Sequence, residues 1–187
     1  MSKSSMSSLR NQFLIAMPHL RDKHFEGTIT YICEHNESGA MGIVINKPMD
    51  LRLSEILEQL DIDGSRLERK MVYTGGPMQS ERGFVIHADD SSWQSSLKVT
   101  EGLTVTTSRD ILAAMASGDG PAKALVALGY AGWSEGQLEQ ELANNFWITC
   151  EADAGILFDT PDPEKIIAAL GRVGIDYHRL ASVAGHG

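Results

Sequence analysis

Hydrophobic and polar residues alternate with a period of two along much of this chain, which is typical of half-buried β-strands. Residues 27–35 show the pattern clearly, because Ile29, Tyr31 and Cys33 share one face of the predicted strand. The pattern predicts strands over residues 12–17, 27–35, 40–46, 71–73, 83–87, 97–99, 103–106, 124–130, 147–150 and 156–158. Strands therefore dominate the predicted secondary structure.

Two of these strands flank the polar segment NESG, whose residue types are common in turns because Gly tolerates positive φ angles. We therefore expect residues 27–35 and 40–46 to pair as an antiparallel hairpin, with Ile43 and Ile45 buried. Pro48 is expected to end the second strand, since proline has no N–H to donate to a neighbouring strand.

Four segments instead repeat hydrophobic residues every three to four positions, as a helix does when it packs one face on a core. Ser54 and Ser108 are candidate N-caps of the first two helices. Pro163 suits the first turn of the last helix. Three of the predicted helices cover residues 54–60, 109–117 and 163–170. The other opens with a capping box at Ser134 and Gln137 and continues through Leu142. Short helices among many strands indicate an α+β fold with a largely mixed sheet.

The length of 187 residues and the 42% hydrophobic content fit one domain with its own core. We predict a single domain over residues 9–183, a Ser-rich N-terminal tail over 1–8 and a C-terminal tail over 184–187. No apolar run approaches the ~18 residues that a membrane helix needs, and the apolar stretch near the N-terminus is too short for a secretory signal. The sequence thus favours a cytoplasmic protein without membrane association.

The charge argues against nucleic acid as a partner. The chain has 25 acidic and 16 basic residues and a net charge of −9, whereas a protein that reads DNA needs clustered Lys and Arg. No helix-turn-helix pair is evident, because predicted strands separate the helices. We therefore expect no direct sequence-specific DNA binding. The sequence also has no zinc-type spacing of Cys and His and no P-loop motif, so we expect no bound metal and no cofactor.

Cys33 and His35 fall on the same face of the predicted strand, where a thiol–imidazole contact would create a nucleophile. No Asn or Asp is identifiably placed to orient His35. The favoured interpretation has Cys33 in the core and His35 at the mouth of the hairpin. We expect Cys33 and Cys150 to be reduced, unpaired and unreactive thiols.

Gly75-Gly76-Pro77 offers a second candidate site, because successive free N–H groups can bind an anion such as phosphate. The segment lacks the P-loop lysine, and Pro77 contributes no N–H. A tight turn between strands is the favoured interpretation.

Further polar residues allow other chemistry. Ser108, Asp110 and His87 supply the residue types of a hydrolase triad, but Ser108 is already explained as an N-cap and no GxSxG motif exists.

Asn46 and Arg82 each adjoin a predicted strand. A structural role is favoured for both: Asn46 bonding a turn backbone, and Arg82 pairing with a carboxylate.

Several stretches together resemble the AlgH/YqgE family of bacterial proteins and follow the order of that family along nearly the whole chain. They are FLIAMP (13–18), YICEHNESGAMGIVINKP (31–48), TGGPMQSERGFVIH (74–87), TTSRDIL (106–112), LGYAGWSEGQLEQEL (128–142), NNFWIT (144–149) and ILF (156–158). Each stretch is weak evidence by itself, but seven in register are highly specific.

The resemblance implies an α+β domain whose bent, bifurcated, mainly antiparallel sheet forms a pseudo-barrel, with about four short helices packed on it. The family carries the label of a regulator through alginate production in pseudomonads, but this label is genetic in character, and the resemblance implies neither a mechanism nor a biochemical activity. It supplies no cofactor and no catalytic residue.

The leading hypothesis is therefore a non-catalytic binding or regulatory protein that acts through a protein or small-molecule partner. The alternative is an enzyme of unassigned reaction type that uses a polar cluster near His35, Asn46, Arg82 and His87. The candidate residues for binding a ligand or partner are His35, Asn46, Gly75, Gly76, Arg82 and His87.

Overall fold

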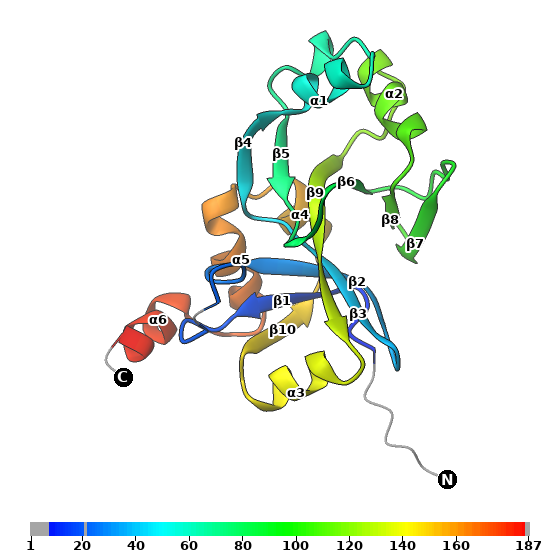
Figure 1. Cartoon of the computed structure of the whole chain (residues 1–187). Coiled ribbons are helices and arrows are strands. Elements are labelled where there is room, and N and C mark those ends of the chain that lie inside the picture. The colour runs from blue at the N-terminus through cyan, green and yellow to red at the C-terminus, as the bar shows by residue number, and fades with distance from the viewer. Residues whose placement is uncertain (1–7, 21, 186–187) are drawn as a thin grey trace.

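A single long strand, β9 (Ala124–Ser134), holds the two halves of the sheet together (Figure 1). Its first part pairs in parallel with β5 (Met71–Thr74) and antiparallel with β6 (Met78–His87). Its last part pairs antiparallel with β3 (Gly39–Val44). Gly129, where the strand changes partners, has a φ angle of 80°, which glycine adopts without steric cost. The sheet is therefore bent and splits at this point.

The computed structural model describes residues 8–20 and 22–185. One half of the sheet continues from β3 through β2 (Ile29–Asn36) and β1 (Gln12–Ala16) to β10 (Trp147–Glu151). The other half continues from β6 to β8 (Leu103–Thr106) and then to β7 (Ser96–Thr100). A further strand, β4 (Pro48–Arg52), lies at the edge beside β5. All pairs except β5 with β9 are antiparallel, which confirms the predicted fold class.

The predicted hairpin is confirmed. β2 and β3 pair antiparallel around the polar turn, and Ile43 and Ile45 are fully buried. Their burial contributes about 2 kcal/mol each from the apolar area removed from water. Both faces of this half are covered, because Tyr31 packs in one hydrophobic cluster and Ile32 in another.

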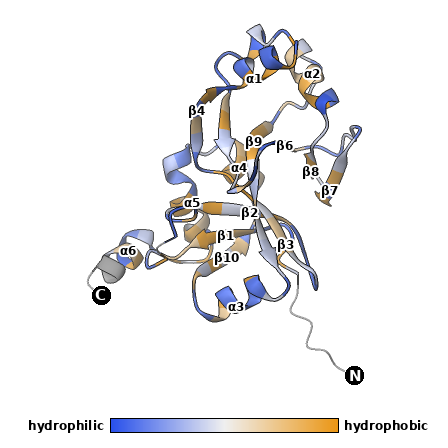
Figure 2. Cartoon of the chain, in the orientation of Figure 1, coloured by the Kyte–Doolittle hydropathy of each residue, from blue (hydrophilic) through white to orange (hydrophobic). Residues whose placement is uncertain are grey.

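Six α-helices cover the ends and one side of the sheet within the described ranges. They are α1 (Leu53–Gln59), α2 (Arg109–Ser117), α3 (Gln137–Ala143), α4 (Ala154–Phe158), α5 (Lys165–Arg172) and α6 (Tyr177–Gly185), with 3₁₀ turns at Ser65–Leu67 and Asp162–Glu164. α1 and α2 lie over the β4–β5 end and α3 lies at the opposite end (Figure 1). The hydrophobic residues concentrate on the strands, while α3 is mostly hydrophilic (Figure 2). No helix in residues 8–20 and 22–185 is long and apolar enough to cross a bilayer.

The structure corrects the prediction for residues 156–158. This ILF run has strand-like composition but belongs to α4, where the Asp153 side chain accepts a hydrogen bond of 3.0 Å from the N–H of Ile156. An N-cap of this kind stabilises the first turn and overrides the strand preference of three residues. Together with α6, this helix raises the count above the four predicted.

The second strand of the hairpin, β3, ends at Val44, before Pro48, as predicted, but Pro48 begins a further strand, β4, that the sequence pattern did not predict. The residue is compatible with a strand because β4 lies at an edge and pairs only with β5. Residues 1–7 and 186–187 of the predicted tails lie outside the described residues, while α6 includes residues 184 and 185.

Three helix starts also differ from the predicted caps. α1 begins at Leu53 with Arg52 as its N-cap, so Ser54 lies inside the helix. The N-cap of α3 is Gly136, and Gln137 accepts a hydrogen bond from the N–H of Ser134, so only half of the predicted capping box forms. Ser108 occupies the N-cap position of α2, but its hydroxyl donates to the Asp110 carboxylate instead of accepting from the helix backbone. The last predicted helix starts as a 3₁₀ turn around Pro163, and α5 runs beyond Leu170.

Candidate functional site

An open groove of about 820 Å³ lies between the two halves of the sheet. One side comes from β3, the last part of β9 and the start of α3. The other side comes from β6, β7 and β8. The volume falls within the roughly 300–1,000 Å³ of known small-molecule sites. The groove is therefore large enough to hold a ligand.

Hydrophobic side chains form most of the groove surface, and one guanidinium accompanies them. The apolar lining includes Met41, Met78, Phe84, Leu97, Val105 and Tyr130. Met78 is 46% exposed, so its side chain presents apolar surface in the groove. Of the described residues that line the groove, Arg82 alone carries a charge. The surface thus combines an apolar floor with a single positive group, as binding pockets commonly do.

A bulge in β6 positions Arg82. Met78 pairs with Tyr130 and Gly83 pairs with Leu128, so the four residues between Met78 and Gly83 leave the ladder with β9. Bulges of this kind redirect side chains away from regular alternation. The Arg82 guanidinium lies 5.4 Å from the centre of the Phe84 ring, within the range of a cation–π contact.

Arg82 remains free to bind something else. Its nearest polar partner is the amide oxygen of Gln79 at 3.4 Å, which is a long hydrogen bond. The ion pairs found among the described residues do not include Arg82, contrary to the predicted pairing with a carboxylate. An exposed guanidinium above an aromatic ring keeps its N–H edge available for an anion.

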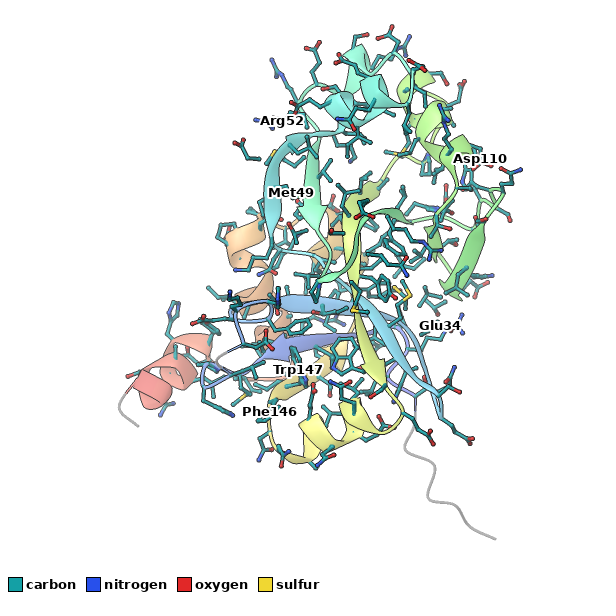
Figure 3. All side chains as sticks on the ribbon, in the orientation of Figure 1. Glu34, Met49, Arg52, Asp110, Phe146 and Trp147 are labelled. Carbon is teal, nitrogen blue, oxygen red and sulfur yellow. The ribbon has the colours of Figure 1, made fainter. Side chains whose placement is uncertain are left out.

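Arg10 connects the two halves of the molecule near this groove. Its guanidinium pairs with Glu34 on β2 at 3.0 Å and donates a 2.9 Å hydrogen bond to the carbonyl of Val99 on β7. Figure 3 places Glu34 on the hairpin side, below β7. This bridge ties the outer ends of β2 and β7 together.

His35 lies outside the groove and is held by two partners. Its Nδ1 accepts a 2.8 Å hydrogen bond from the N–H of Leu9, so Nε2 carries the proton. That atom lies 3.4 Å from a carboxylate oxygen of Glu139 on α3. His35 therefore fastens the N-terminal segment and α3 to the hairpin.

The prediction that Cys33 and His35 share a strand face is wrong. The pairing of β2 with β3 shifts between Ile32 and Glu34, so a bulge interrupts the alternation. Cys33 consequently packs in the cluster that contains Tyr31, while His35 turns to the opposite face toward α3. The Cys33 sulfur contacts the carbonyl of Tyr31 at 3.7 Å. The two residues do not form a thiol–imidazole pair.

Asn46 bonds the backbone at the start of β2. Its side-chain amide donates to the carbonyl of Gly27 at 3.0 Å and accepts from the N–H of Ile29 at 3.1 Å. Both ends of the amide are therefore used in fixing the chain around the turn that precedes β2.

Gly75 and Gly76 allow the chain to cross β9 at close range. The N–H of Gly75 donates to the carbonyl of Leu128, and the carbonyl of Gly75 accepts from Val44, both at 2.8 Å. A Cβ atom on Gly76 would lie 2.2 Å from a backbone atom of Tyr130. The N–H of Gly75 is thus unavailable to an anion, as expected for a structural crossing.

His87 is fully buried inside a ring of hydrogen bonds. Its Nδ1 lies 2.6 Å from Asp89, and its Nε2 lies 2.8 Å from the hydroxyl of Thr106, which contacts Ser96 at 2.7 Å. Burial opposes ionisation of Asp89, but hydrogen bonds from Ser91 and His87 outweigh it and lower the pKa of this carboxyl. The ring fixes the loop that follows β6.

The residues considered for a hydrolase triad do not assemble. His87 pairs with Asp89, whereas Ser108 donates to Asp110 at the start of α2. The predicted polar cluster does not assemble either. In the part of the chain that the structure describes, no hydrogen bond or ion pair joins any two of its four residues, which are His35, Asn46, Arg82 and His87.

A second cavity of about 510 Å³ lies under α1 and α2. Its lining is apolar on Ile56, Leu112 and Val126, and Glu81 and Arg109 supply opposite charges. The described residues contain no group of three or more His, Cys, Asp or Glu side chains that could hold a metal ion. The larger groove, with its unpaired guanidinium, is the stronger candidate site.

The model of the AlgH-like family matches residues 13–178, which is most of the chain. The chain belongs to the AlgH-like family. It is 64% identical over 183 residues to a UPF0301 protein of Hahella chejuensis, with 98% of both chains covered. It is 51% identical over 189 residues to the UPF0301 protein AlgH of Pseudomonas aeruginosa strain PAO1, with 100% of both chains covered.

Solved structures support the same relationship. The chain resembles the solution structure of AlgH from Pseudomonas aeruginosa with a TM-score of 0.82, at 50% identity and with 96% of both chains covered. It also resembles the crystal structure of a protein from Corynebacterium diphtheriae with a TM-score of 0.66, at 18% identity over 86% of this chain and 83% of that one. The second likeness concerns the fold alone. The resemblance of the sequence to the AlgH/YqgE family is therefore confirmed.

Most residues of the groove could not be predicted from the sequence. Met41 and Phe84 fall within predicted strands, and Met78 lies between two of them, so none of the three stands out in the sequence as a binding residue. They meet only after β3, β6 and β9 have paired across long sequence separations. The polar QSER segment (79–82) lies between two predicted strands, and its residue types do not indicate the bulge that places Arg82 on the groove.

Both cysteines are unpaired and buried in the described structure. Burial raises the pKa of each thiol, and for Cys33 the charge of Glu34 adds to this effect. We expect neither residue to react with iodoacetamide in the folded protein at neutral pH, whereas both react after unfolding in guanidinium chloride. Mass spectrometry of the alkylated protein measures this, and rapid modification of Cys33 under native conditions would contradict it.

Proposed function

We propose that this protein is a cytoplasmic, non-catalytic binding protein that acts through a ligand held in the groove between the two halves of its sheet. The observation that carries the proposal is the groove itself, about 820 Å³ in volume and lined mainly by apolar side chains, with Met78 exposed and Arg82 unpaired. A regulatory role would follow if the bound ligand changed how the protein meets a partner.

The binding proposal fits the polar residues better than the enzymatic alternative does. The side chains of His35, Asn46 and His87 already form hydrogen bonds within the protein that hold neighbouring segments together. A general acid or base must instead reach a proton on the substrate. The groove, by contrast, offers shape, apolar surface and one charge, which suffice for recognition.

A substitution at Gly132 tests the proposal. Gly132 lies on the groove surface, and a Cβ atom there would point toward the Tyr130 ring at 3.4 Å and Met78 at 3.8 Å. We expect Gly132→Leu to fill part of the groove and to weaken ligand binding about tenfold or more, because the new side chain excludes the ligand's apolar part. Gly171→Leu is the matched control, since nothing lies within 4 Å of a Cβ atom at that exposed helix position.

The measurement is a screen of a metabolite library by NMR with ¹³C-labelled methionine methyl groups. Ligands of the groove should shift the methyl signals of Met41 and Met78, and Gly132→Leu should require about tenfold more ligand for the same shifts, while Gly171→Leu behaves like the wild type. Ligands that bind both variants equally, or that shift only Met49 and Met115 in the hydrophobic cluster under α1 and α2, would contradict the proposal.

A further inference from the structure

We propose that the natural ligand of the groove is a monoanionic amphiphile, an aliphatic or aromatic chain that ends in a single carboxylate. This inference rests on the proposed function and adds the chemical class of the ligand. It follows from how charge and apolar surface are distributed over the two sides of the groove.

The apolar part of the ligand would lie against side chains from both halves of the sheet. Met41 and Tyr130 come from the β3–β9 half, and Leu97 and Val105 come from β7 and β8. Unbranched methionine side chains such as Met41 and Met78 adjust readily to ligands of different shape. A flexible or planar apolar chain, rather than a sugar or a peptide rich in polar groups, matches these walls.

The charged part of the ligand is defined by Arg82. The remaining polar side chains at the groove are neutral, among them Ser95, Thr107, Ser134 and Gln137. One guanidinium therefore faces the ligand in a protein whose net charge is −9. A cation would meet repulsion from Arg82, and a neutral chain would leave the guanidinium without a partner.

The single charge of Arg82 also indicates how many charges the ligand carries. A carboxylate carries one negative charge and accepts two parallel hydrogen bonds from a guanidinium, so the pair is neutral. A phosphate monoester carries ≈ −1.5 to −2 at pH 7, so part of its charge would stay uncompensated inside an acidic protein. The single arginine thus favours a monoanion.

The geometry around Arg82 suits this role. Its guanidinium carbon lies 5.4 Å from the centre of the Phe84 ring, and the only side-chain hydrogen bond found for it in the described chain is the long one to Gln79. Its N–H edge is consequently available for the carboxylate, while the ring of Phe84 continues into the apolar surface where the chain of the ligand begins.

The test compares three probes with the same ten-carbon chain below their micelle concentrations: decanoate, decanol and decyltrimethylammonium. Affinities come from the methyl shifts of Met41 and Met78 in the full-length protein. We expect decanoate to bind about tenfold tighter than decanol, and decyltrimethylammonium to cause no saturable shift. Arg82→Gln should reduce the affinity for decanoate to that for decanol, Arg82→Lys should retain part of the difference, and the exposed control Arg69→Gln should change neither.

Each outcome decides between the two proposals. Equal binding of decanoate and decanol in the groove, or an unchanged decanoate affinity in Arg82→Gln, overturns the monoanion inference and leaves groove binding supported. Absence of any decanoate shift at Met41 and Met78 also overturns it, and the metabolite screen then decides the proposed function separately. Co-sedimentation of the protein with vesicles of anionic phospholipid at physiological salt, lost in Arg82→Gln, would show that Arg82 binds a lipid surface instead of a free amphiphile.

Discussion

Gly75→Ala is expected to lower the free energy of unfolding by about 3 kcal/mol or more, the upper range for overpacking of a well-packed site. A Cβ atom at this position would lie 2.3 Å from the carbonyl oxygen of Gly129, a backbone atom on β9. The same methyl group would press on Ala127 at 3.1 Å and Ile43 at 3.2 Å. Since the crossing segment is bonded to both β3 and β9, it cannot move away without breaking hydrogen bonds in both halves of the sheet.

Urea denaturation followed by far-UV circular dichroism measures this effect. Gly171→Ala is the matched control, because a Cβ atom there meets nothing within 4 Å. Alanine favours a helix over glycine by up to about 1 kcal/mol, so the control should be unchanged or slightly more stable. If Gly75→Ala were as stable as Gly171→Ala, the close crossing of β9 would be wrong.

The fold was largely predictable because local and long-range signals agree along most of the chain. In the hairpin of β2 and β3, alternating hydrophobic residues and a Gly-containing turn favour the same structure. Strand β8 and helix α2 have the predicted bounds, since each carries a regular hydrophobic period.

The prediction failed where one local contact outweighed the periodic pattern. In α4 the Asp153 cap converts a strand-like run into a helix. In β2 a bulge after Ile32 reverses which face each following side chain occupies, and so separates Cys33 from His35. Periodicity cannot reveal a bulge in advance, because the extra residue changes the register without a distinctive residue type.

The groove was less predictable than the fold for a different reason. Its walls come from β3, β6, β7, β8 and β9, and no single segment contains the pattern. Arg82 was singled out as a polar residue next to a strand, and the structure places it on the groove. The other candidate residues for ligand binding serve mainly to hold segments together. A site made by pairing distant strands leaves only scattered residues in the sequence.

Asp162→Asn is expected to destabilise the protein by about 3 kcal/mol, because it leaves a buried ammonium without its counter-charge. Lys165 is 2% exposed, and its Nζ lies 2.8 Å from Asp162 and donates a 2.7 Å hydrogen bond to the carbonyl of Ile45. Asp162 also accepts a hydrogen bond of 2.9 Å from the hydroxyl of Tyr73, whose ring lies 4.9 Å from the ammonium. This cluster attaches α5 to the end of β3.

Two further variants distinguish the effect of the uncompensated buried charge on stability from other effects of replacing an aspartate. Asp162→Asn combined with Lys165→Met should recover part of the lost stability, since no uncompensated charge remains in the core. Asp159→Asn is the control, because Asp159 and its partner Lys123 are each about half exposed, at 54% and 51%. An exposed pair contributes roughly 0–1 kcal/mol, so this variant should remain close to the wild type.

The pH dependence of the Asp162→Asn variant provides the sharpest test of the cluster. Burial lowers the pKa of Lys165, and Asp162 opposes that shift, so the substitution should lower this pKa further in the folded state. The unfolded chain, with its lysine near the ordinary value of about 10.4, then binds more protons in the window between the two values, and stability rises with pH. The deficit relative to the wild type should therefore shrink as the pH rises toward the ordinary lysine pKa, followed up to about pH 9.5, below the ordinary tyrosine pKa of about 10. A deficit that stays constant over this range in urea titrations would show that Lys165 is not held in its charged form by Asp162.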